Sequence, residues 1–349
     1  MRIVLFCENK YAIDILSPIG EEAEREGGNE VLWFVRQKRI PHFPLDGKVR
    51  WTTVMQEVYD FSPEAIFVPG NIVPYYLPGV KIQVFHGYAT EKKDHWIIRR
   101  YFDTYFTQGP FFTPRFKQLA KKYGDFEVLE TGWSRQDWIF NHLHAFDNER
   151  ERLLKESGRS RILLYAPTFS PSLTSLPYME EALANLVQQR DVLILIKLHP
   201  LTKPEWVETY RQLAVRQEGI QWVDDYSVTK YMLMSNAMLT DTSSTIYEFL
   251  LLNKPVITLR ATSKEFYWRD MKSPDELLDA YDEVMEHDTM KERRQWVIDN
   301  YDPYLDGRVA HRMLEGARDY IRRHGVPPYR RLNLWRKYTS IKTFGRVKR

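Results

Sequence analysis

The sequence predicts an α/β protein of two domains, each built on a parallel sheet. Short apolar runs rich in β-branched residues alternate along the chain with amphipathic stretches of helical length. The 349 residues are 43% apolar and 14% aromatic, which is enough to bury a large core and favours two domains over one. This composition excludes intrinsic disorder as a class.

The expected elements follow this alternation in chain order. A helix over residues 12–26 is expected first, because its apolar residues recur at helical spacing and Gly27-Gly28 is a stop signal. Strands are expected at residues 2–7, 31–35, 65–68, 81–85, 104–107, 127–129, 161–166, 192–198, 220–223, 237–240 and 256–259. Further helices are expected at residues 178–189, 204–218, 228–234, 243–252, 274–286, 290–300 and 308–323.

A polar stretch at residues 141–160, ending in Ser157-Gly158, separates the two halves of this pattern. We therefore expect an N-terminal domain over residues 1–145 and a second over residues 155–323, followed by a basic aromatic tail at 324–349. The lone Cys7 can form neither an internal disulfide nor a cysteine-based zinc site, which favours a reducing, cytoplasmic setting. We see no signal-peptide core and no apolar run long enough to span a bilayer.

Two histidines follow predicted strands, where open α/β sheets bind their ligands. His86 comes at the end of the strand 81–85 and precedes Gly87, which suits a general base in a crevice. The alternative is a histidine that only bonds a loop carbonyl. His199 ends the strand 192–198 beside Lys197 and is held extended by Pro200; buried polar partners and a catalytic role explain this pair equally well.

Hydroxyl side chains gather after the strand 237–240. Thr242, Ser243 and Ser244 belong to a run of five hydroxyl residues around Asp241, at the start of an expected helix. Capping needs only one of them, so the run favours a phosphate or diphosphate site. Thr168, in the loop after the strand 161–166, is either a phosphate contact or a turn residue.

Arg135 is either a phosphate ligand or the partner of Asp137 in a surface pair, and Asp306 is expected to cap the last helix. Walker A and dinucleotide-binding fingerprints are missing, which argues against P-loop and nicotinamide enzymes. The histidines and carboxylates show no metal-binding spacing, so we expect no metal and no cofactor.

Residues 320–349 carry ten Lys or Arg and no acidic residue, interleaved with aromatic side chains. Basic residues attract anionic lipid headgroups, and Trp and Tyr settle at the membrane interface. We therefore expect the segment Tyr320 to Arg349 to dock on an anionic membrane surface and expect no nucleic acid partner. A nucleic acid site and a solvated, partly disordered tail are the alternatives.

Taken together, these loops resemble those of the CDP-glycerol glycerophosphotransferase family, the teichoic-acid primases and polymerases. The resemblance spans roughly residues 81–323 and rests on six segments in the family's order: Phe85-His86-Gly87, residues 132–137, residues 165–169, residues 197–200, residues 240–255 and Asp306-Gly307-Arg308. Ser170 departs from the family, many members of which carry Arg at that position.

The resemblance implies a GT-B fold of two Rossmann-like domains and an enzyme attached to the inner face of the cell membrane. It implies transfer of a polyol phosphate, typically glycerol phosphate, from its CDP ester to a hydroxyl of a polymer or lipid-linked saccharide, with release of CMP. His86 would take the proton of that hydroxyl, and His199, Ser243 and Ser244 would hold the diphosphate, with help from Thr168 and Arg135. Lys197, Thr242 and Glu248, from the same segments, complete the expected donor site.

Two rival interpretations remain at this point. A glycosyltransferase that uses a UDP-sugar or CMP-Kdo would share the two-domain layout and the histidine near the donor phosphates. A non-catalytic membrane scaffold with an enzyme's fold would bind without turnover.

Overall fold

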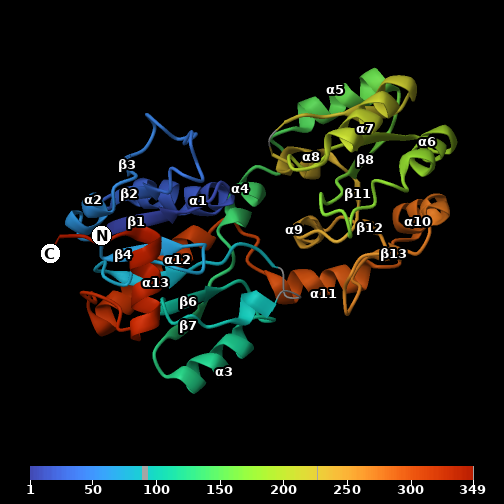
Figure 1. Cartoon of the computed structure of the whole chain (residues 1–349). Coiled ribbons are helices and arrows are strands. Elements are labelled where there is room, and N and C mark those ends of the chain that lie inside the picture. The colour runs from blue at the N-terminus through green and yellow to red at the C-terminus, as the bar shows by residue number, and fades with distance from the viewer. Residues whose placement is uncertain (89–92, 226, 349) are drawn as a thin grey trace. The chain divides into compact units, whose positions relative to one another are not determined.

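The computed structural model describes residues 1–88, 93–225 and 227–348, and these divide into two compact units (Figure 1). Unit 1 comprises residues 1–141 and 300–349, and unit 2 comprises residues 142–299. Each unit contains one sheet in which every strand pairs in parallel. The predicted fold class, an α/β protein with two parallel sheets, is confirmed.

Unit 1 has a seven-stranded sheet in the order β3-β2-β1-β4-β5-β6-β7. Its strands are β1 (Arg2–Cys7), β2 (Glu30–Val35), β3 (Trp51–Thr52), β4 (Ala65–Val68), β5 (Val80–Gln83), β6 (Thr104–Thr107) and β7 (Glu127–Glu130). Its helices are α1 (Tyr11–Glu26), α2 (Met55–Asp60), α3 (Thr113–Tyr123), α4 (Arg135–Asn141), α12 (Val309–His324) and α13 (Leu334–Phe344), with a 3₁₀ turn at Lys93–Trp96.

Unit 2 has a six-stranded sheet in the order β10-β9-β8-β11-β12-β13. Its strands are β8 (Arg161–Tyr165), β9 (Val192–Ile196), β10 (Ile220–Trp222), β11 (Ala237–Thr240), β12 (Val256–Leu259) and β13 (Arg269–Met271). Its helices are α5 (Asp147–Ser157), α6 (Glu180–Gln189), α7 (Pro204–Arg216), α8 (Thr229–Met234), α9 (Thr245–Leu251), α10 (Leu277–Asp282) and α11 (Lys291–Tyr301), whose last two residues belong to unit 1. A 3₁₀ turn at Pro274–Glu276 precedes α10, and a π-helical turn at Glu283–His287 follows it.

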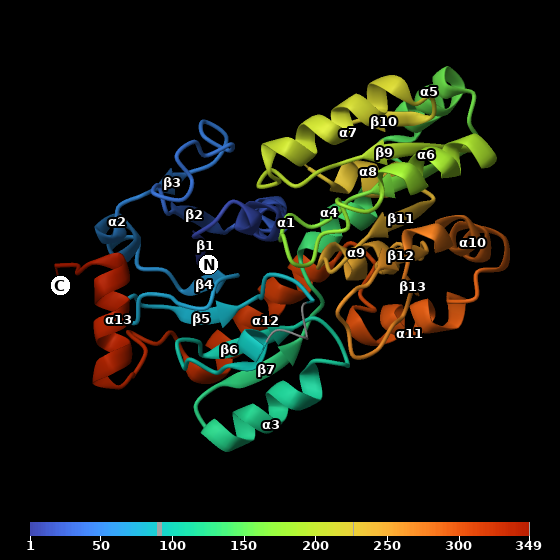
Figure 2. The same cartoon turned by 45° about the vertical axis from the view of Figure 1, so that its right-hand side comes forward.

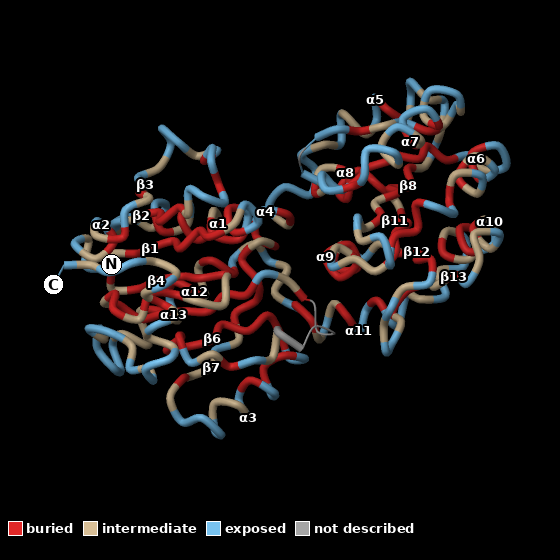
Figure 3. The backbone as a smooth tube through the Cα atoms, viewed as in Figure 1, coloured by how far each residue is buried: buried red, intermediate tan, exposed pale blue. Residues whose placement is uncertain are grey.

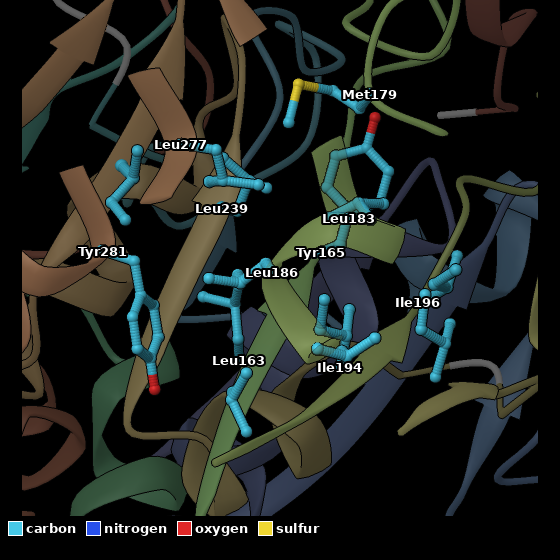
Figure 4. Close-up of a cluster of buried hydrophobic side chains, with 14 of the residues drawn as sticks. Leu163, Tyr165, Met179, Leu183, Leu186, Ile194, Ile196, Leu239, Leu277 and Tyr281 are labelled. Carbon is cyan, nitrogen blue, oxygen red and sulfur yellow. The ribbon is translucent and has the colours of Figure 1, made fainter. Parts of the chain in front are cut away.

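Central strands such as β8 and β9 are buried on both faces, which is why they read as continuous apolar runs (Figure 3). In unit 2, side chains of β8, β9 and β11 pack under α6 and α10, and Figure 4 shows Leu163, Ile194 and Leu239 of the sheet in this cluster with Leu183 and Tyr281 of the helices. Burying each such side chain stabilises the fold by about 1.5–3 kcal/mol.

The second unit is shorter than the domain expected at residues 155–323. Residues 300–323 pack with unit 1, because α12 lies on its sheet: a Cβ at Gly316 would come within 2.3 Å of Leu129 and 3.1 Å of Phe106. Helix α12 also lies along α1, where Arg318 pairs with Glu26. The apolar spacing of α12 predicted its helix but carried no information about which sheet it would cover.

Candidate active site

His86 stands just beyond β5, at the carboxyl edge of the first sheet. The chain turns sharply there, with φ of 58° at Phe85 and 142° at Gly87. Glycine adopts a positive φ without the steric cost of a side chain. Gln108 Nε2 stabilises the turn by donating to the Gly87 carbonyl at 2.9 Å. The turn leaves the His86 side chain exposed.

A backbone contact assigns the roles of the two ring nitrogens of His86. Its Nδ1 lies 3.2 Å from the carbonyl oxygen of Pro69, which can only accept a hydrogen bond. In the neutral ring Nδ1 therefore carries the proton and Nε2 carries the lone pair. This is the loop-carbonyl contact that we expected of a purely structural histidine. The same contact selects the tautomer with a lone pair on Nε2, which a general base needs.

Charged side chains that sequence reasoning passed over surround this edge. Glu8 directly follows β1 and is only 5% exposed, and Arg36 after β2 contacts its Oε1 at 3.2 Å. Burial raises the pKa of Glu8, and the charges of Arg36 and Arg39 act against that rise. Tyr11 stands beside His86, with ring centroids 5.7 Å apart. Glu8 and Arg36 could have been noticed in the sequence, because each comes immediately after a predicted strand.

Arg135, expected as a phosphate ligand, begins α4 in unit 1. Its Nη1 lies 3.4 Å from Asp14 Oδ2, and its guanidinium stands 5.9 Å from the Trp133 ring centroid. Asp137 is not its surface partner: it is buried, and its carboxylate accepts the backbone N–H groups of Val309 and Ala310 at 2.8 and 2.6 Å.

Asp137 therefore caps α12 from a distant part of the chain, a role we had expected of Asp306. Asp306 instead accepts the N–H of Arg308 and pairs with Arg312 through both oxygens. Burial raises the pKa of Asp137 to about 6, against the effect of its backbone hydrogen bonds.

The buried Asp302 joins two loops of unit 1. Its Oδ2 accepts the Tyr88 hydroxyl at 2.6 Å and the Trp133 N–H at 2.9 Å, so the loop that follows His86 is tied to the loop that precedes Arg135. Complete burial raises the pKa of Asp302 to about 8. No sequence pattern identified this carboxyl group.

In unit 2, His199 follows β9 and has the opposite tautomer. Its Nδ1 accepts the N–H of Leu201 at 3.1 Å, so the proton of the neutral ring is on Nε2, a donor. Burial, with a smaller contribution from Lys197, lowers the pKa of His199 and keeps the ring neutral near pH 7. Phe169 stacks on the ring at 4.4 Å between centroids.

Lys197 lies inside the strand end. Only 8% of it is exposed, and its Nζ donates to the Leu198 carbonyl at 3.1 Å. Burial lowers its pKa, whereas the charges of Asp224 and Asp225 raise it. This geometry supports a structural role for the ammonium group, and the donor contact that the sequence suggested stays a prediction.

Asp241, at the centre of the hydroxyl run, is fully buried and organises the loop after β8. Its Oδ1 accepts the Thr168 N–H at 2.9 Å, and its Oδ2 accepts the Ser175 N–H at 2.9 Å and the Ser175 hydroxyl at 3.1 Å. Phe169 lies in this loop, so Asp241 supports the ring that stacks on His199.

The expected hydroxyl ligands differ in their local contacts. Thr242 Oγ1 accepts the Thr262 N–H at 2.9 Å, and Ser243 Oγ lies 2.8 Å from Thr245 Oγ1. Ser244 is exposed at the N-cap of α9 and makes no side-chain capping bond there. Glu248 is buried on α9, 7% exposed.

These residues share one edge of the second sheet because β9, β8 and β11 are neighbours in that order. Thr168, His199 and the run from Thr242 to Ser244 each follow the carboxyl end of one of these strands. His86 and Arg135 belong to unit 1.

One potential metal-ligand group was found among the described residues. Ligand atoms of Glu22, Glu26 and His311 lie within 4.8 Å of one another. His311 Nδ1 bonds both carboxylates and Arg318 pairs with Glu26, so ion pairing accounts for the group. The absence of a metal stays a prediction.

Comparison with known proteins places the chain. Residues 78–316 match the family described as CDP-Glycerol:Poly(glycerophosphate) glycerophosphotransferase. The chain belongs to this family. The matched range contains both histidines and every other expected site residue.

Characterised relatives are teichoic acid enzymes. The ribitol-phosphate polymerase TarK of Staphylococcus aureus is 27% identical over 54% of this chain and 40% of its own length. The glycerol-phosphate primase of Bacillus subtilis is 26% identical over 56% of this chain and 49% of its own. The aligned region thus spans about half the length, or less, of these relatives.

Solved structures share the fold over nearly the whole chain. The wall teichoic acid polymerase TagF, in crystals soaked with CDPG, has a TM-score of 0.63 at 16% identity and covers 92% of this chain and 89% of its own. The S. aureus protein MnaA bound to UDP has a TM-score of 0.69 at 15% identity over 92% and 97% of the two chains. The expected GT-B-like architecture is confirmed.

Proposed function

We propose that this member of the family transfers a polyol phosphate, with glycerol phosphate as the first candidate, from a CDP-activated donor to a hydroxyl group of a cell-surface polymer or lipid-linked acceptor. The observation that supports this most strongly is the pair of contacts at the two Nδ1 atoms: that of His86 lies against the Pro69 carbonyl, and that of His199 accepts the Leu201 N–H, which assigns opposite tautomers to the neutral rings. One ring has its lone pair on Nε2 and the other has its proton there. Transfer at phosphorus is promoted by a proton acceptor for the attacking hydroxyl and by a hydrogen-bond donor to the oxygens on which negative charge accumulates.

In the proposed reaction the acceptor oxygen attacks the phosphorus that bears the polyol. A new P–O bond forms, and the bond from that phosphorus to the oxygen of CMP breaks. His86 Nε2 takes the hydroxyl proton, and CMP leaves as a phosphate monoester. His199 Nε2–H, with Thr242, Ser243 and Ser244, donates to the diphosphate oxygens as negative charge accumulates.

Arg135, Thr168, Lys197 and Glu248 are the remaining members of the proposed site. Arg135 is proposed to contribute positive charge to donor binding. Thr168 fixes the loop after β8 by donating its backbone N–H to Asp241. Lys197 fixes the end of β9 by donating its ammonium group to the Leu198 carbonyl. Glu248, buried on α9, is proposed to contact the nucleotide part of the donor.

The test is CMP release from CDP-glycerol with acceptor present, for the full chain and single variants. His86→Ala should lower kcat at least about 100-fold, the usual loss when a general base is removed. His199→Ala should lower kcat/KM for the donor, and His199→Gln, which retains an N–H donor, should recover part of it. His144→Ala is the matched control, because His144 is exposed and pairs with Asp147 on α5.

A donor panel distinguishes the rival functions. CDP-glycerol and CDP-ribitol should release CMP, and CMP-Kdo and UDP-sugars should be inert. Turnover of a UDP-sugar or of CMP-Kdo alone would establish a glycosyltransferase. Donor binding without turnover in any acceptor mixture, unchanged in His86→Ala, would support the scaffold interpretation. Unchanged turnover in His86→Ala would overturn the assigned role of that residue.

A further inference from the structure

The C-terminal segment is a packed helix with an uncovered outer face. Arg330 anchors it: its side chain is only 11% exposed and its Nη1 lies 2.9 Å from the buried carboxylate of Asp103. The Gly79 N–H donates to the Pro327 carbonyl at 2.9 Å, and the Arg330 N–H donates to the Tyr75 carbonyl at 2.8 Å. The segment is therefore ordered, contrary to the alternative of a solvated tail.

Helix α13 packs on unit 1 through one side (Figures 1 and 2). The Ser340 hydroxyl accepts the Tyr75 N–H at 3.3 Å, and the Tyr76 hydroxyl donates to the Gly345 carbonyl at 2.8 Å. Phe344 packs edge-on against Phe6 at 5.3 Å between ring centroids. These contacts fix which face of α13 points away from the unit.

The outward face presents three large apolar side chains to solvent. Leu334 is 84% exposed, Trp335 70% and Tyr338 57%. They lie on successive turns of one helix face, and the rings of Trp335 and Tyr338 are 6.0 Å apart. Isolated exposed apolar residues are ordinary, but three adjacent ones on a single helix indicate a binding surface.

The charges around this face identify the occupant. Arg331, just before α13, and Lys342, one turn beyond Tyr338, are exposed, and residues 325–349 contain no acidic residue. Not all of the basic residues from residue 320 onward are available for lipid: Arg322 and Arg323 pair with acids on α12 and β7, and Arg330 is mostly covered and pairs with Asp103. The surface available for lipid is thus smaller than the whole segment from Tyr320 to Arg349 that the sequence suggested.

We propose that the outer face of α13, formed by Leu334, Trp335 and Tyr338 within this basic rim, docks on an anionic lipid surface. The aromatic and apolar side chains enter the headgroup region, and the basic side chains neutralise lipid phosphates. Among the described residues no helix is long and apolar enough to cross a membrane, so this contact is peripheral. The proposal is independent of the transferase activity.

Cosedimentation of the full chain with lipid vesicles tests it. The protein should sediment with phosphatidylglycerol vesicles and not with phosphatidylcholine vesicles, and salt should weaken binding. The double variant Leu334→Glu with Trp335→Glu should lower the partition coefficient at least tenfold. Val215→Glu is the matched control, since Val215 is 88% exposed on α7 and should leave binding unchanged.

Point variants replace deletion of the tail, because residues 327–348 pack against unit 1 and their loss would expose its core. Circular dichroism and CMP release should be the same for the double variant and the wild-type chain in the absence of vesicles. Equal sedimentation of the double variant and the wild type would overturn the proposal. So would failure of the wild type to bind either vesicle, or binding to single-stranded RNA in place of vesicles.

Discussion

Replacing Asp241 by Asn perturbs the loop that supports His199 while preserving the size of the side chain. The carboxylate accepts Thr168 N–H on one oxygen and two donors of Ser175 on the other. An amide has only one acceptor oxygen. Whichever way it is turned, its NH₂ group faces a backbone N–H, either that of Thr168 or that of Ser175.

The expected loss follows from this count. At least one hydrogen bond to a charged acceptor disappears, and each such bond contributes about 1.5–3 kcal/mol. The amide removes the cost of burying a charge, a cost expressed in the raised pKa of Asp241, and this offsets part of the loss. We expect a net destabilisation of about 2 kcal/mol, concentrated in the loop that bears Phe169.

Hydrogen exchange measured by mass spectrometry on residues 166–176 reports the local opening, and CMP release reports function. Opening should become about 30-fold more frequent in Asp241→Asn, and donor kcat/KM should fall about tenfold as Phe169 loosens its stack on His199. Asp224→Asn is the control, because Asp224 is an exposed acid of the same unit. Unchanged exchange in Asp241→Asn would refute the assigned support role.

Three further predictions concern unit 1. The pKa of Asp302 is about 8 in the folded protein, above the usual value of about 4 for an aspartic acid. Between these two pH values the folded state holds a proton that the unfolded state has lost, so the free energy of unfolding should fall as pH rises. Urea titrations should show a flatter dependence on pH for Asp302→Asn. Gly132→Ala should lower the free energy of unfolding by about 2 kcal/mol or more, because φ is +93° there and the added Cβ would lie 2.7 Å from Val309. Thermal unfolding should show a smaller loss of stability for Gly124→Ala, whose Cβ would have no neighbour within 4 Å. Arg330→Met should cost about 3–5 kcal/mol, because the buried Asp103 loses its guanidinium partner and keeps the Lys81 backbone N–H. Limited proteolysis should then cut near residue 327, and resistance equal to wild type would contradict this.

The sequence was informative about elements whose stabilising interactions are local or periodic. The runs at residues 192–198 and 237–240 contain the buried strands β9 and β11, and α1 ends where Gly27 adopts a positive φ of 70°. It missed β13, because Arg269–Met271 is too short and polar to form an apolar run. It also missed α13 and α5, whose compositions indicate polar linkers when read without their neighbours.

The site was predictable to the level of strand ends and no further. The positions of His86 and His199 after two parallel strands were predictable, and their roles stay predictions that rest on the rule that ligands bind at the carboxyl ends of such strands. Their tautomers were not, since these depend on Pro69 and Leu201 carrying the facing backbone groups. The support role of Asp241 likewise depends on contacts made across the sheet, which no local pattern encodes.

Unit 1 is assembled from two stretches of chain separated by the whole of unit 2. During synthesis its strands emerge first, but α12, which covers Leu129 and Phe106, emerges only after unit 2. Part of the first sheet therefore stays uncovered by α12 while the 158 residues of unit 2 are synthesised. Ribosome-bound chains from which unit 2 has fully emerged, but α12 has not, should consequently bind chaperones through unit 1.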